Sequence, residues 1–114
     1  MPINKSTAKH YVWGDQFDAW DLIDQETLTI KQLKMPAHTV EPLHYHQNAK
    51  QFFYILKGKA TLRLSQERIG LTEQDGIEIL PNIPHQMINE TNDVLELMVV
   101  STPSANKDKI IVTE

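Results

Sequence analysis

The chain is predicted to be an all-β protein of the sandwich or barrel type, on three observations. Almost no stretch shows the spacing of apolar residues that an amphipathic helix needs. Short extended runs are instead separated by turn residues about every eight to twelve positions, which is typical of β-sandwiches and barrels. Residues 51–56 are largely apolar on both faces of an extended strand, which indicates a strand that is buried on both sides.

The expected strands follow the turn signals in chain order. Residues 19–23 and 27–35 are predicted to form a hairpin, with Trp20 entering the core, and proline at position 36 ends its second strand. Residues 43–47 and 51–56 are predicted to pair with each other. After a turn at Lys57-Gly58-Lys59, the remaining expected strands cover residues 60–65, 68–71, 76–80, 85–89 and 95–101.

A chain of 114 residues is expected to form one domain with a single core. We expect an N-terminal extension over residues 1–18 and a barrel over residues 19–101. Residues 102–114 are expected to be a loose tail or an edge strand laid on a partner, because the tail ends in an apolar run. The outer face of residues 51–56 is apolar as well (Phe52, Tyr54 and Leu56), so a homodimer is expected.

Composition excludes several classes of protein. The net charge is −4 and no basic run interleaves with aromatic residues, which argues against a nucleic-acid partner. Cysteine is absent, so disulfides, thiolate metal sites and thiol nucleophiles are excluded. No apolar run has the length of a membrane span and the N-terminus lacks the apolar core of a signal peptide, so we expect a cytoplasmic protein with no membrane partner.

Two histidines stand two positions apart, at His44 and His46, and residues two apart on a strand point to the same face. Gln51 follows five residues later and His85 lies on a separate segment. Neighbouring imidazoles, joined by a third imidazole and another donor, indicate a metal site. The plain alternative is that these histidines are ordinary polar residues on a solvent-exposed face.

These segments resemble the two motifs of the cupin superfamily. His44-Tyr45-His46, Gln51 in place of the usual glutamate, and Gly58 match the first motif, while His85 and Asn89 match the second. The sequence departs from the motifs at the positions where glycine or proline is usual, which here are His38, Gln74, Leu80 and Asn82. The likeness covers residues 19–101, and the segments HYVWG and HYHQNAKQFFYILKGKATL resemble those of small single-domain bacterial cupins.

The resemblance implies a double-stranded β-helix (jelly-roll, cupin) barrel with a divalent transition metal, which would be Mn, Fe, Co, Ni or Zn. Its ligands would be His44, His46 and His85, with Gln51 as a fourth ligand or as an outer residue that orients a water. A neutral glutamine would leave the metal's charge undiminished and favour an anionic partner. Asn89 is expected to be a strand-end hydrogen bonder.

The function expected from this resemblance is that of a metal-dependent enzyme, of isomerase, tautomerase or dioxygenase type, acting on a small polar molecule, for which a sugar acid or a keto acid is one option. The alternative is a ligand-binding or sensing module, because no acid or base accompanies the histidines in the motif; a metal-free structural protein is a third hypothesis. Catalytic residues are not assigned, and Glu41 and Glu78 are the acids nearest in sequence. Phe53, Ile55 and Met87 are candidates for a substrate wall, although core packing is their default role.

Overall fold

The computed structural model describes residues 2–113, which form strands and turns without any helix. None of these residues therefore belongs to a helix that could cross a membrane. The strands are β1 (Lys9–Trp13), β2 (Phe17–Gln25), β3 (Leu28–Met35), β4 (Thr39–Val40), β5 (His44–His46), β6 (Lys50–Lys57), β7 (Ala60–Arg63), β8 (Arg68–Leu71), β9 (Gly76–Ile79), β10 (Gln86–Asn89), β11 (Leu95–Thr102) and β12 (Lys109–Ile111).

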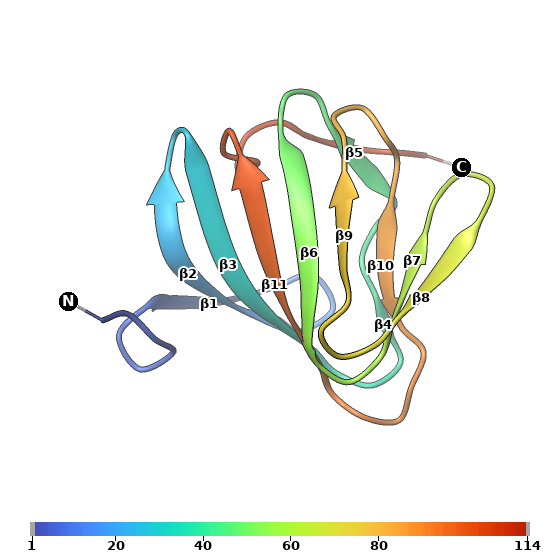
Figure 1. Cartoon of the computed structure of the whole chain (residues 1–114), viewed down its shortest axis with the longest axis horizontal. Helices are drawn as coiled ribbons and strands as arrows, with labels where there is room; N and C mark the ends of the chain where they lie inside the picture. The colour runs from blue at the N-terminus through green and yellow to red at the C-terminus, as the bar shows by residue number, and fades with distance from the viewer. Residues whose placement is uncertain (1, 114) are drawn as a thin grey trace.

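Two antiparallel sheets diverge like the sides of a V (Figure 1). The larger has the strand order β1-β2-β3-β11-β6-β9 and the smaller the order β4-β10-β7-β8, while β12 and β5 pair separately. The smaller sheet pairs non-consecutive strands, such as β10 with β4 and β7. This all-β architecture is the expected fold class, the double-stranded β-helix.

Strand β6 shows how alternation sorts side chains between the two faces of the larger sheet. Gln51, Phe53 and Ile55 point inward and are 7%, 4% and 0% exposed. Phe52 and Leu56 point outward and are each 40% exposed. The predicted alternation is therefore confirmed, and the outer face of β6 is uncovered in the single chain.

The hydrophobic core lies between the two sheets. Its buried members are Phe17, Ala19, Leu33, Met35, Phe53, Ile55, Ala60, Leu62, Leu71, Ile79, Met87, Leu95, Leu97 and Val99. The turn from β6 to β7 requires glycine at Gly58, where φ is +90° and a Cβ atom would lie 2.7 Å from the carbonyl oxygen of Val94.

Two expectations from the sequence are corrected. Strand β5 does not pair with β6, because both edges of β6 are occupied by β11 and β9; β5 pairs with β12 instead. Trp20 does not enter the core, because Phe17 and Ala19 take the inward positions of β2 and leave Trp20 on the opposite face, beside His10. The sequence also gave no indication of β1 or the two-residue β4.

The two terminal segments both contribute strands. Within the stretch expected as an extension, β1 pairs with β2 at the edge of the larger sheet. The C-terminal segment, residues 103–112, runs from the β2–β3 turn to β5. It is attached to the turn by the Ser104 amide, which donates to the Glu26 carbonyl over 2.9 Å. There β12 pairs with β5 of its own chain, so the segment crosses one end of the space between the sheets (Figure 1).

Candidate metal centre

The three motif histidines are brought together by backbone pairing. His44 and His46 both face inward from β5, and they are 4% and 5% exposed. The amide of His44 donates to the carbonyl of His85 over 3.1 Å, and the amide of His85 donates back over 2.8 Å. This bridge places His85 directly beside His44, and the possible metal-ligating atoms of all three rings lie within 4.8 Å of one another.

Each imidazole is held by an oxygen that accepts from Nδ1. Nδ1 of His44 lies 2.8 Å from the Pro42 carbonyl, and Nδ1 of His85 lies 2.9 Å from the Ile83 carbonyl. Nδ1 of His46 lies 2.8 Å from a carboxylate oxygen of Asp108. These oxygens accept, so the proton of each neutral ring is on Nδ1, and Nε2 presents its lone pair.

Burial lowers the pKa values of all three histidines and so favours their neutral form. Burial brings the pKa of His44 to about 3 and that of His85 to about 4, and it lowers the pKa of His46 as well. Neutral rings with fixed tautomers and lone pairs on Nε2 are what a divalent transition metal requires of histidine. The donor set therefore fits such a metal, which His44, His46 and His85 would hold.

Gln51 faces this cluster from the opposite sheet. Its Oε1 lies 3.1 Å from Nε2 of His85, and its Nε2 donates to Oγ of Ser101 over 3.1 Å. In this orientation two lone pairs face each other between Gln51 and His85, and a cation held by both would relieve that repulsion. An amide turned by 180° would instead donate to His85 and accept from the Ser101 hydroxyl, so the orientation of this side chain decides whether it is a ligand.

Asp108 is a site residue that no motif indicated, because it lies in the C-terminal tail. One of its carboxylate oxygens accepts from His46, and the other accepts from the amides of Asn48 and Ala49 over 2.9 and 3.0 Å. Burial alone would raise the pKa of Asp108, but these hydrogen bonds outweigh it and lower the pKa. Asp108 therefore fixes both the ring of His46 and the turn that leads into β6.

His44 and His46 open onto a cavity of about 200 Å³. At about 30 Å³ for each water, this is the space of roughly seven waters, so the cavity suits a small molecule. Trp13 and Phe53 line it. The other lining residues are Tyr11, Thr29, Lys31, Leu33, Glu41, His44, His46, Gln51, Val99, Ser101, Ala105, Asn106 and Lys109.

Glu41 is the acid that the cavity contains, and nearness in sequence was the signal for it. It is 7% exposed, and burial raises its pKa to about 7. Its Oε1 accepts from the amide of Met87 over 2.9 Å. The other carboxylate oxygen of Glu41, Oε2, has no hydrogen-bond partner among the described residues. Because no fully buried side-chain oxygen of these residues lacks a partner, Oε2 is not fully buried and is accessible from the cavity.

The other expected residues divide between the site and the core. Ile55 and Met87 belong to the hydrophobic core and not to the cavity wall. Asn89 is a hydrogen bonder at a strand end, as predicted, and donates to the carbonyls of Met35, Pro36 and Asp93. Glu78 is exposed on β9, away from the cavity.

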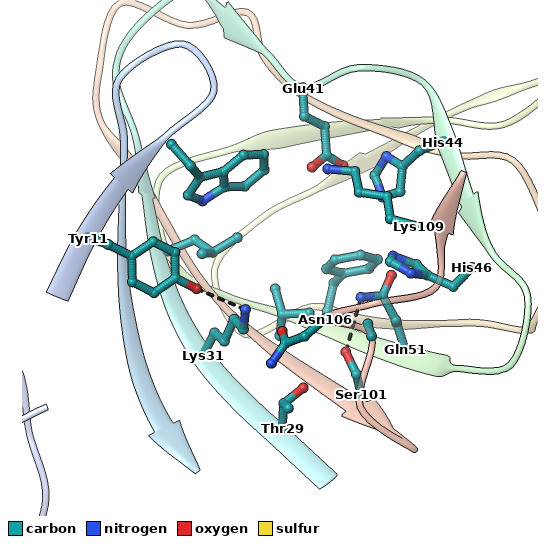
Figure 2. A pocket seen from close by; sticks show the side chains of 15 residues that line it. Tyr11, Thr29, Lys31, Glu41, His44, His46, Gln51, Ser101, Asn106 and Lys109 are labelled. Atoms are coloured by element: carbon teal, nitrogen blue, oxygen red, sulfur yellow. Dashed lines mark hydrogen bonds between the residues drawn. The ribbon is translucent and has the colours of Figure 1, made fainter. Parts of the chain in front are cut away.

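Figure 2 shows the cavity between the histidines on one side and β1 and β3 on the other. Lys31 reaches in from β3, and its Nζ donates to the hydroxyl of Tyr11 over 2.8 Å. Lys109 reaches in from β12 on the same side as Glu41 and lies over the ring of Trp13, with Nζ 4.7 Å from the centroid.

The family of the chain follows from its sequence as well as from this architecture. Residues 32–101, more than half of the chain, match the model of the cupin domain. The chain belongs to the cupin family.

Known proteins resemble the chain in sequence or in fold. The uncharacterized protein MJ1618 of Methanocaldococcus jannaschii is 30% identical over 69 residues, which are 60% of this chain and 55% of that protein, so the match spans little more than half of the relative. The polyketide cyclase RemF of Streptomyces resistomycificus has a TM-score of 0.83 at 15% identity, covering 100% of this chain and 87% of that chain. A sugar phosphate isomerase of Silicibacter pomeroyi has a TM-score of 0.80 at 16% identity, covering 91% and 76%.

Proposed function

We propose that this protein is a metal-dependent enzyme that isomerises or tautomerises a small, oxygen-rich anion of the keto-acid or sugar-acid type. The observation that carries the proposal is the presence of Glu41 in the cavity that His44 and His46 line, next to the three-histidine cluster. The main objection to catalysis was the absence of an acid or base beside the metal ligands, and Glu41 removes that objection.

The metal would be held by His44, His46 and His85, with Gln51 in reach as a fourth ligand. When bound, a divalent metal supplies Lewis-acid chemistry, which stabilises negative charge on an oxygen of the substrate. Since Gln51 is neutral, the ligands cancel none of the metal's charge, which favours an anion at the open position.

Glu41 is suited to move a proton at its Oε2 atom. A group with a pKa near 7 is present in both protonation states at neutral pH, which is the condition for acting as a base in one step and an acid in the next. The amide of Met87 holds Oε1 in place, so proton exchange is directed to the oxygen that meets the cavity. Isomerisation by proton transfer needs one such group, and no oxidant.

Similarity to enzymes of this kind supports the proposal only weakly. The structural neighbours include a sugar phosphate isomerase and a polyketide cyclase, each at 16% identity or less. At that level the likeness is one of fold, and the same fold carries many reactions. The side chains of the cavity are therefore the main support.

The experiment is a screen of small keto acids and sugar acids in deuterium oxide, followed by proton NMR, with protein loaded with each candidate metal. Isomerisation by proton transfer predicts exchange of a carbon-bound hydrogen or appearance of an isomer. His46→Ala is expected to lose both the metal and turnover, while Glu41→Gln is expected to keep the metal and lose turnover.

The matched control for Glu41→Gln is Glu78→Gln, which removes an exposed acid outside the cavity. Turnover that survives in His46→Ala without metal would refute the proposal. Bound metal with no turnover on any compound would favour the ligand-binding module instead. Oxygen consumption by an iron-loaded protein would replace isomerisation with dioxygenase chemistry.

A further inference from the structure

The cavity is lined by two lysines and by one buried carboxyl group. Its charged walls, apart from the histidines, are Lys31, Lys109 and Glu41, whereas the whole chain has a net charge of −4. A positive cavity in an acidic protein concentrates anions locally. The metal proposed above would add to this charge, but the two lysines provide it without any metal.

Lys109 is the less satisfied of the two cations. Within the part of the chain that the structure describes, no carboxylate lies within 4.0 Å of its Nζ, although the charge of Glu41 acts on it. Its Nζ lies over the ring of Trp13. Partial burial lowers its pKa, as expected for an ammonium group that lacks a hydrogen-bonded counter-ion. The pairing of β12 with β5 fixes the backbone of Lys109 opposite His46.

Lys31 is held in position by Tyr11, the residue two before Trp13 on β1. The Tyr11 hydroxyl accepts from Lys31 and donates to Asp21 over 3.1 Å, while Asp21 itself is 3.9 Å from Nζ of Lys31. Nζ of Lys31 has two further protons to donate. Figure 2 shows Lys31 beside Tyr11 at one wall of the cavity and Lys109 beside Glu41 and His44 at the other, so both ammonium groups reach the cavity.

We propose that Lys31 and Lys109 form a carboxylate-binding subsite, so that the substrate is a small carboxylic acid whose carboxylate binds the lysines while another oxygen faces the histidines. The inference rests on the proposed function for what happens at the histidines, but the subsite itself needs no metal.

The composition of the wall favours a carboxylate over a phosphate. No arginine lines the cavity, and the described residues contain no helix whose N-terminal amides would cradle a phosphate. The volume of about 200 Å³ is small as well. A three- or four-carbon acid is small enough for this volume.

The test uses malonate as the probe and metal-free protein, with the indole N–H signal of Trp13 followed by NMR. Malonate is expected to shift the Trp13 signal and to leave Trp20, which lies outside the cavity, unchanged. Neutral malonamide is expected to shift neither. Lys31→Gln and Lys109→Gln are each expected to weaken malonate binding about fivefold, the upper end for a partly exposed ion pair.

Lys57→Gln is the matched control, because Lys57 is exposed and lies outside the cavity. Equal affinity in all three lysine variants, or an equal response to malonamide, would overturn the subsite. An unchanged Trp20 signal in each variant verifies that the fold is intact.

His44→Ala/His46→Ala separates this inference from the proposed function. The subsite predicts that malonate still shifts Trp13 in this variant, whether or not the protein is an enzyme. If only the histidine variant loses the malonate response, the carboxylate binds at the histidines. That result would overturn the subsite and leave the proposed function intact. Absence of metal and turnover, with malonate binding retained, would refute the proposed function alone.

Discussion

Asp108→Asn is the substitution that tests most sharply how the C-terminal segment serves the metal centre. The carboxylate of Asp108 accepts from His46, Asn48 and Ala49, and only 10% of the side chain is exposed. Asparagine has one acceptor oxygen, so its NH₂ group must face either the ring N–H of His46 or the two backbone amides. Either arrangement sets donor against donor.

The expected cost appears in two quantities. Loss of an oxygen that orients a ligating histidine weakens metal binding by about 10- to 100-fold. In the metal-free protein, a lost hydrogen bond to a charged group lowers the free energy of unfolding by about 1.5–3 kcal/mol. The loss of metal affinity has to be larger than partial unfolding of the variant would cause. The metal affinity and the free energy of unfolding are therefore measured under the same conditions.

The assay is competition for zinc against a chromophoric chelator at pH 7.5, with urea unfolding of the metal-free protein alongside. Asp15→Asn is the matched control, since Asp15 lies exposed in the turn between β1 and β2. Zinc affinity in Asp108→Asn equal to that of the wild type, in protein that unfolds cooperatively, would refute the role assigned to Asp108.

Three further predictions concern the charge of the centre, its response to pH and the assembly. Gln51→Glu buries a carboxylate beside His85, which lowers the melting temperature without metal and increases the gain on adding zinc; an unchanged gain would contradict ligation at this position. In metal-free protein, His44 and His85 have pKa values lowered from 6.5, so they destabilise the folded state as the pH falls below about 6.5. Glu41 has a pKa raised from 4.5 to about 7, so it stabilises the folded state over the same fall in pH. Glu41→Gln should therefore steepen the fall in unfolding free energy between pH 6.5 and pH 5 by up to about 1.4 kcal/mol per pH unit, and a shallower fall would argue against the raised pKa. Tyr54→Lys, on the outer face of β6, should dissociate the proposed homodimer in light scattering without loss of metal; a dimer that persists would place the interface elsewhere.

Much of the fold could be predicted because alternation and turn residues act locally. The strands from β6 to β11 lie close to their predicted positions, since proline, glycine and apolar alternation mark their ends. The partner of β5 could not be predicted in the same way. Nearness in sequence favoured β6, but the edges of β6 are filled by β9 and β11, and that is a property of the whole sheet.

The residues of the site also fall into those that could be predicted from the sequence and those that could not. His44, His46, Gln51 and His85 could be selected from spacing and from the cupin resemblance, and the structure brings them together. Asp108 and Lys109 could not be predicted as site residues from the sequence. They reach the site because β12 pairs with β5, which is far from it in the sequence.

Burial was the second property that the sequence hid. Glu41 was visible as a nearby acid, but its raised pKa comes from its enclosure, and a sequence does not show enclosure. Tyr11 likewise lies at the site because β1 pairs with β2 at the edge of the larger sheet, and its hydroxyl accepts from Lys31 of β3.

The most direct test of the account is elemental analysis of protein purified without an affinity tag or chelator, for the wild type and for His44→Ala/His46→Ala. The account predicts about one equivalent of a divalent transition metal in the wild type and none in the variant, in line with a single three-histidine cluster among residues 2–113. A wild type that carries no metal and takes up none on titration, or a variant that retains it, would contradict the account.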